Sequence, residues 1–96
     1  MHFEIPHTFT KADAHARTQY LFDYWKSAYG VQSHWQGDHA FIAGRVMGVE
    51  IIAELVVDEQ QIRGGGEDPG PFLRALARNY ITQKLRKYMH PEYREP

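Results

Sequence analysis

With 96 residues, no cysteine and a formal net charge of −1 at pH 7, the chain suits one domain, which we place over residues 1–96. The missing cysteines exclude disulfides and thiolate metal sites, and they fit a reducing compartment. No apolar run approaches the ~20 residues of a membrane span and the N-terminus has no signal-peptide pattern, so we expect a cytoplasmic protein without a membrane span.

The first strand and the first helix differ in their hydrophobic period. Phe3 and His7 lie on the same side of a period-2 pattern, and Pro6 predicts an edge position or a bulge because it lacks an amide donor. From residue 11 the apolar positions follow a helical period: Ala14, Thr18, Leu21, Trp25, Ala28 and Tyr29. Thr10 is the predicted N-cap, and Gly30 the predicted left-handed C-terminus.

Three strands and a short fourth are expected after residue 30. Residues 31–36 and 39–46 flank the turn Gly37-Asp38 and predict a hairpin. The run VEIIAELVV (residues 49–57) is rich in β-branched residues and long enough for a central strand. Residues 60–63 are expected to return briefly as a fourth strand.

Glycines gather between Gly64 and Gly70, just before the second predicted helix. Such loops hold phosphate in some proteins, but this one lacks the lysine followed by Ser or Thr that phosphate and magnesium require. We expect Gly64–Gly66 to form a loop with positive φ angles, and the helix to begin at Pro71. Its apolar stripe is Leu73, Leu76, Ala77, Tyr80, Ile81, Leu85 and Tyr88.

The element order is therefore β-α-β-β-β-(β)-α. The turns between the later strands are too short for crossovers, so these strands are antiparallel. Each helix has one apolar stripe, and an alternating sheet has one apolar face. We predict a two-layer α+β fold in which both helices pack on one face of an antiparallel sheet.

The second helix contains the basic residues of a candidate interaction surface. Residues 71–90 hold five Lys or Arg and no acidic residue, whereas residues 1–70 hold five Lys or Arg and ten acidic residues. The five are Arg74, Arg78, Lys84, Arg86 and Lys87. Segregation of this kind marks a candidate binding face. Nucleic acid is a weaker hypothesis for its partner, because the pI of about 6.6 is far below that of a typical nucleic-acid binder.

No catalytic, metal or cofactor site is predicted. The six histidines lack the spacing of a zinc site, and no serine or threonine has the context of an activated nucleophile. A small-ligand binder or enzyme would need a pocket between helices and sheet, for which His7, Trp25 and Trp35 are the candidate lining. For His7 we also expect a structural hydrogen bond from the strand end to the first helix.

Three segments resemble the polyhydroxyalkanoic acid system protein family, small bacterial proteins often encoded beside polyhydroxyalkanoate granule genes. They are IPHTFTKADAHAR, YGVQSHWQGDHAFIAG and VMGVEI, of which the tryptophan–x–glycine–aspartate turn is the most specific. The resemblance implies a link to polymer-granule metabolism. It supplies no catalytic residues, because the family has no established activity.

Two main hypotheses follow from the residues and the resemblance. The first is a non-enzymatic accessory protein that binds a protein or a granule surface, works in the cytoplasm at granules and forms a homodimer. Surplus tyrosines such as Tyr20, Tyr24 and Tyr93 would form its apolar patch if they share a surface. The second is the small-ligand binder or enzyme.

Overall fold

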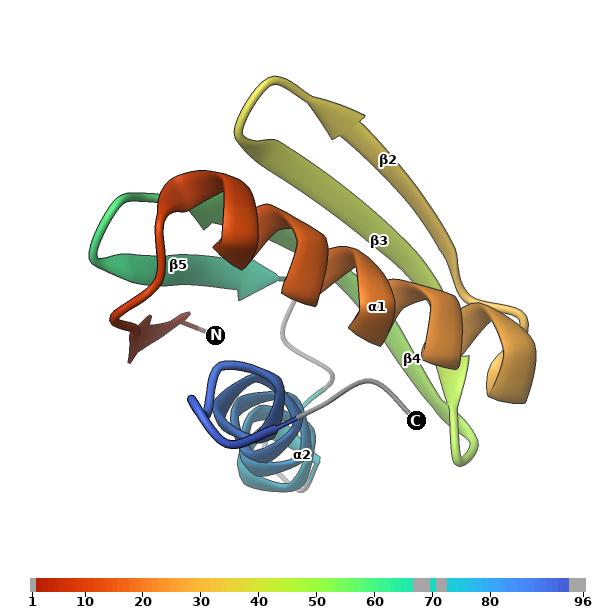
Figure 1. The fold of residues 1–96 in the computed structure, drawn as a ribbon. Coiled ribbons are helices and arrows are strands. Elements are labelled where there is room, and N and C mark those ends of the chain that lie inside the picture. Colours follow the sequence, from red (N-terminus) through yellow and green to blue (C-terminus); the bar gives the residue numbers. More distant parts are fainter. Residues whose placement is uncertain (1, 67–69, 71–72, 94–96) are drawn as a thin grey trace.

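A computed structural model describes residues 2–66, 70 and 73–93 of the chain. Its elements are β1 His2–Pro6, α1 Lys11–Tyr29, β2 Gln32–Gln36, β3 His39–Val46, β4 Val49–Val57, β5 Gln61–Gly66 and α2 Arg74–Tyr88. The strands form one antiparallel sheet, and both helices lie on the same side of it (Figure 1). The predicted α+β architecture is confirmed.

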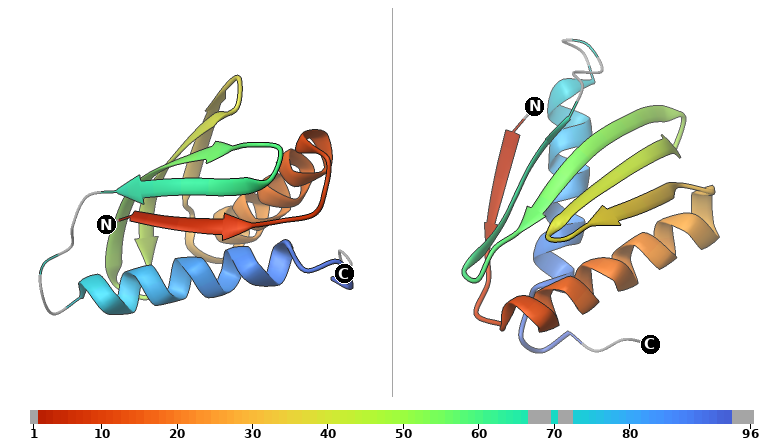
Figure 2. Two further views of the ribbon diagram at one scale, coloured as in Figure 1. Left: turned by 90° about the vertical axis from the view of Figure 1, so that its left-hand side faces the viewer. Right: turned by 90° about the horizontal axis from the view of Figure 1, so that it is seen from above.

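The sheet has the order β1-β5-β4-β3-β2, so that β1 and β2 form its edges. Strand β1 pairs with β5, far away in the sequence, with Ile5 opposite Ile62. The edge position predicted from Pro6 is correct, because a residue without an amide hydrogen is tolerated there. Helix α2 runs along β1, as the left-hand view of Figure 2 shows.

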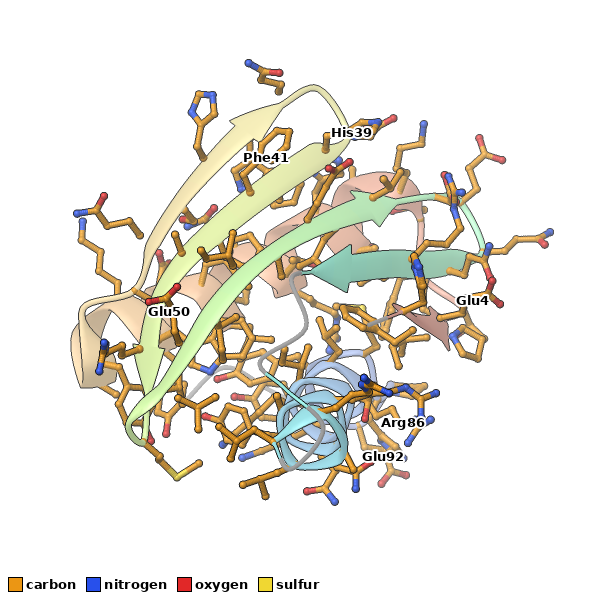
Figure 3. All side chains as sticks on the ribbon, turned by 180° about the vertical axis from the view of Figure 1, so that it is seen from behind. Glu4, His39, Phe41, Glu50, Arg86 and Glu92 are labelled. Carbon is orange, nitrogen blue, oxygen red and sulfur yellow. The ribbon has the colours of Figure 1, made fainter. Side chains whose placement is uncertain are left out.

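The core lies between the sheet and the two helices, and it follows the alternation of the strands. The buried strand residues are Phe3, Ile5, Ala40, Ile42, Val46, Ile51, Ala53, Leu55, Val57 and Ile62. From the helices come Ala14, Leu21, Phe22, Trp25, Ala77, Ile81, Leu85 and Tyr88. The intervening strand residues point to the uncovered face, where Phe41 and Glu50 are seen in Figure 3. One face of the sheet is thus buried under the helices, and the other is exposed to solvent.

The predicted boundaries of α1 are confirmed. The Thr10 hydroxyl accepts a hydrogen bond from the Asp13 amide at 3.1 Å, which satisfies one of the free donors of the first turn. Gly30 ends the helix with φ 74°, the left-handed conformation that glycine adopts without strain. The buried Thr18 hydroxyl donates to the Ala14 carbonyl at 2.8 Å, so it leaves no polar atom unpaired in the core.

The loop predicted for Gly64–Gly66 is wrong, because these residues continue strand β5 and pair with β4 on one side. Gly64 stands opposite both Phe3 and Leu55, whose side chains point to the same face. A Cβ on Gly64 would lie 2.5 Å from the Phe3 ring and 2.7 Å from Leu55. A side chain at this position would clash with both neighbours, so glycine is required for Phe3 and Leu55 to pack against the strand.

Helix α2 departs from prediction at its N-terminal end. The expected start at Pro71 lies outside the described residues, and the described helix runs Arg74–Tyr88. Leu73 and Leu76 were expected on the buried stripe but are exposed, Leu76 by 60%. The stripe becomes buried from Ala77 onward, so the first turn of the helix carries apolar side chains that face solvent.

Candidate functional site

His7 is buried at the end of β1 and has both ring nitrogens bonded. Its Nδ1 accepts from the Phe9 amide at 3.2 Å, and its Nε2 lies 2.9 Å from the carbonyl oxygen of Asp58. Since the amide is a donor and the carbonyl an acceptor, the ring is neutral with its hydrogen on Nε2. These bonds connect β1, the segment before α1 and the turn between β4 and β5.

The two tryptophans occupy different surroundings from His7. Trp25 is buried, and its indole Nε1 donates to the Tyr80 hydroxyl of α2 at 3.2 Å. Trp35 is half-buried on β2, and its Nε1 donates to Gln19 of α1 at 2.7 Å. Within the described residues, no hydrogen bond or ring contact joins His7 to either tryptophan. The two tryptophan rings both contact Phe22, whereas the contacts of His7 are with Phe9 and Asp58.

The tryptophan–x–glycine–aspartate turn docks on one face of α1. Asp38 accepts hydrogen bonds from Lys11 Nζ and His15 Nε2, each at 3.0 Å, and the His15 ring stacks on Trp35 at 4.4 Å. Lys11, His15 and Gln19 follow one another at four-residue spacing, which aligns them on one side of a helix. That spacing was the signal for this contact, which sequence reasoning missed.

Electrostatics in this cluster follow from the pairing. The hydrogen bonds from Lys11 and His15 lower the pKa of Asp38 from its ordinary value of 3.8. The same carboxylate raises the pKa of Lys11 from 10.5. The Asp38 carboxylate of the β2–β3 turn is paired with two side chains of α1, and these hydrogen bonds position the hairpin on the helix. A reacting group is not required to account for them.

The candidate basic residues of α2 point toward different neighbours. The Arg78 side chain donates to the backbone carbonyl of His2 on β1 at 3.1 Å. Lys84 faces the other way, with its amine 4.8 Å from the ring centre of Tyr24 on α1. Lys87 lies 5.7 Å from the ring centre of Tyr93, while Arg74 and Arg86 are exposed. The structure divides this basic set around the helix.

A cation that sequence reasoning missed secures the end of α2. Arg17 Nη1 donates to the carbonyls of Tyr88, His90 and Tyr93 at 3.0, 3.3 and 3.3 Å. Its guanidinium also lies 3.9 Å from the ring centre of Phe9. A cation at a helix C-terminus satisfies free carbonyls and complements the helix dipole. Its role is to fix α2 against α1.

A cleft of about 440 Å³ opens between α2 and the β3–β4 hairpin. We call it the helix–hairpin cleft; its lining is Val46, Met47, Val49, Ile51, Leu76, Ala77, Asn79, Tyr80 and Gln83. The right-hand view of Figure 2 shows the helices as a V, with the sheet across its open side. Met47 and Leu76, exposed by 65% and 60%, are the most exposed large apolar side chains among the described residues.

Tyrosines extend this apolar surface from the cleft onto α1. Tyr24 and Tyr29 meet edge to face, with ring centres 6.3 Å apart. Partial desolvation and hydrogen bonding with the phenols of Tyr24 and Tyr80 raise the pKa of Tyr29. Since Tyr80 also lines the cleft, the rings extend the apolar surface of the cleft onto α1.

The uncovered face of the sheet has a second hollow, of about 530 Å³, near Phe41 and Ile52. Unlike the cleft, it is lined by charged groups as well, including Glu54 and Arg63. His39 lies beside it, with Nδ1 3.1 Å from a Glu54 carboxylate oxygen (Figure 3). Of the two hollows, the helix–hairpin cleft is the more apolar candidate for binding.

Residues 2–66, 70 and 73–93 contain neither a candidate membrane span nor a candidate metal site. Neither helix there combines the length and apolar character that crossing a bilayer requires. No three histidine or carboxylate side chains in that part of the chain converge as a metal site.

Comparison with known proteins places the chain in a family. No curated protein and no solved structure is significantly similar to it. The family described as polyhydroxyalkanoic acid system protein matches residues 1–92, nearly the whole length. The match includes the turn at Trp35–Asp38 and both walls of the helix–hairpin cleft. The chain belongs to the polyhydroxyalkanoic acid system protein family.

Proposed function

We propose that this protein is a non-enzymatic accessory protein that adheres to the surface of polyhydroxyalkanoate granules in the cytoplasm. The family supports the link to the polymer. The single observation that carries adhesion is the distribution of exposed apolar side chains. Of eight such large side chains among the described residues, six lie on the helix side of the molecule: Tyr20, Tyr24, Tyr29, Met47, Leu73 and Leu76.

The composition of this helix-side surface suits a boundary between polymer and water. Contiguous exposed apolar side chains mark interaction sites, since their burial on a partner is favourable. Tyrosine adds an apolar ring with a hydroxyl that can stay hydrated, which fits an interface with one dry and one wet side. Lys84, seated over the Tyr24 and Tyr80 rings, supplies a cation at its margin.

Granule fractionation from a polymer-accumulating host tests this function. We expect the wild-type chain to sediment with granules, and Leu76→Glu to move mostly to the supernatant because a carboxylate resists burial. Ile52→Glu is the matched control, since Ile52 is also exposed but lies on the other face of the sheet. Its sedimentation should equal that of the wild type.

Two outcomes would contradict the proposal. A wild-type chain that stays in the supernatant of granule-containing cells has no affinity for granules. Loss of sedimentation in Ile52→Glu but not in Leu76→Glu would assign adhesion to the uncovered sheet face instead. Granules stripped of their proteins distinguish the two kinds of target, because a chain that needs a granule protein will bind only native granules.

A further inference from the structure

We propose that the helix–hairpin cleft binds a short stretch of the polyester chain itself, a neutral aliphatic ester. This inference rests on the proposed function, because granules are what bring such esters to the protein. It goes further by assigning one site and one ligand chemistry. The cleft volume of about 440 Å³ falls within the roughly 300–1,000 Å³ range of small-molecule sites.

One wall of the cleft is aliphatic and comes from the β3–β4 hairpin. Val46, Val49 and Ile51 line it, with Met47 at the turn. Beta-branched residues on paired strands give a stiff apolar surface. Such a wall suits the hydrocarbon side chains of a polyester, which gain by leaving water.

The opposite wall comes from α2 and offers neutral hydrogen-bond donors. Asn79 and Gln83 are one helical turn apart, so their amides lie on the same side of the helix. Neither side chain makes a hydrogen bond to the described part of the chain. An ester carbonyl only accepts hydrogen bonds, and these amides have hydrogens to donate.

Charge complementarity excludes an ionic ligand from the cleft. None of its lining residues is charged. Lys84, which follows the lining residue Gln83 in the sequence, is not part of the lining and lies over the Tyr24 and Tyr80 rings. A carboxylate drawn into the cleft would lose hydration without gaining an opposite charge. An esterified chain, which has no free carboxylate along its length, avoids this cost.

The β3–β4 turn presents an exposed apolar side chain at the cleft. Met47 has φ 51°, a conformation that costs a non-glycine residue energy, and its side chain is 65% exposed. Glycine or asparagine would relieve the strain. The two-residue turn of the β3–β4 hairpin takes a positive φ at both Met47 and Gly48, so the hairpin sets this conformation and leaves the Met47 side chain exposed at the edge of the cleft.

Titration of the purified chain with the methyl ester of a 3-hydroxyoctanoate trimer tests the site. In methyl-resolved NMR we expect shifts for Val46, Val49 and Ile51. Leu76→Glu should weaken binding at least tenfold, and Ile52→Glu should leave it unchanged. The free 3-hydroxyoctanoate anion should bind more weakly than the trimer ester. A fatty alcohol of similar length should also bind more weakly, because it has no ester carbonyl for the amides.

Four results would contradict the assignment of the cleft to an ester. The ester assignment fails if the trimer shifts none of the three methyl groups, if the alcohol binds as well as the trimer, or if only the uncovered face responds. It also fails if sedimentation analysis finds a stable dimer that Leu76→Glu dissociates, because a second copy would then fill the cleft. Granule co-sedimentation without trimer binding would leave the accessory function in place and remove only this inference.

Discussion

The two hairpins of the sheet meet the helices in opposite ways. At the β2–β3 turn, Asp38 binds Lys11 and His15 of α1, and Trp35 packs on the same helix face. The β3–β4 turn has aliphatic side chains on one wall of a cleft, with Met47 exposed at its tip. A hairpin held on α1 mainly by the packed Trp35 ring, with the Asp38 hydrogen bonds adding little, is committed to the fold, whereas one bordering an open apolar cleft remains available to a ligand.

The largest effect is expected from Trp35→Ala in the locked hairpin. The substitution removes the ring between His15 and Phe22 and the hydrogen bond to Gln19. Because Trp35 is only half-buried, we expect the free energy of unfolding to fall by about 2 to 3 kcal/mol. Urea denaturation followed by circular dichroism measures it.

Gln36→Ala is the control for that measurement, since Gln36 is the exposed neighbour on the same strand. A surface change of this kind should stay within about 0.5 kcal/mol of the wild type. If Trp35→Ala were equally harmless, the β2–β3 hairpin would not be locked in the sense argued, and the contrast between the hairpins would disappear.

A smaller loss is expected from Tyr80→Phe, a substitution in the lining of the cleft. The substitution keeps the ring and removes the hydroxyl that accepts from the buried indole of Trp25. An unpaired donor in the core costs about 1 to 2 kcal/mol. Thermal unfolding should show the loss, and Tyr20→Phe serves as a control for an exposed tyrosine that does not line the cleft. Equal effects in both variants would contradict the assignment.

Much of the fold was predictable because its determinants are local. The period-2 run ending at Pro6, the Thr10 cap and the terminator Gly30 each act within a few residues. The short turns then force antiparallel pairing. By contrast, Gly64 was misassigned because its reason lies in Phe3 and Leu55, which are distant in sequence and meet it only in the folded sheet.

The candidate site was less predictable for the same reason. The cleft lies between residues near position 47 and residues near position 80, and the periodicity within either segment does not predict that the two segments are neighbours in the fold. Helical spacing places Leu76 on the apolar stripe but does not show which turns of the helix are covered, and Leu76 is 60% exposed. The surplus of tyrosines was the sequence feature that pointed to an apolar surface. The Lys84 amine contacts both Tyr24 and the cleft residue Tyr80, which brings these two rings to the same region.

Met47→Gly should slightly raise the free energy of unfolding and lower the affinity for the trimer ester. Relief of the left-handed strain at φ 51° should add up to about 1 kcal/mol to the free energy of unfolding. Trimer binding should fall several-fold, because the exposed thioether side chain is lost. The neighbouring Gly48 has φ 81°, so Gly48→Ala should instead destabilise the turn. A stabilised Met47→Gly with full trimer affinity would show that Met47 takes no part in binding.

The smallest effect is expected from Asp38→Asn, because exposed ion pairs contribute little in water, but its pH dependence is distinctive. A carboxyl group whose pKa is lowered on folding stabilises the protein above its ordinary pKa of 3.8, and that contribution is lost as the pH falls through the folded value. The raised pKa of Lys11 sets the other limit: its contribution is present below 10.5 and is lost as the pH rises through the folded value. Urea midpoints of wild type and Asp38→Asn should therefore differ most between these limits and converge at acidic and strongly alkaline pH. A difference that is constant across the whole range would show that the charge of Asp38 contributes nothing to the docking of the β2–β3 hairpin.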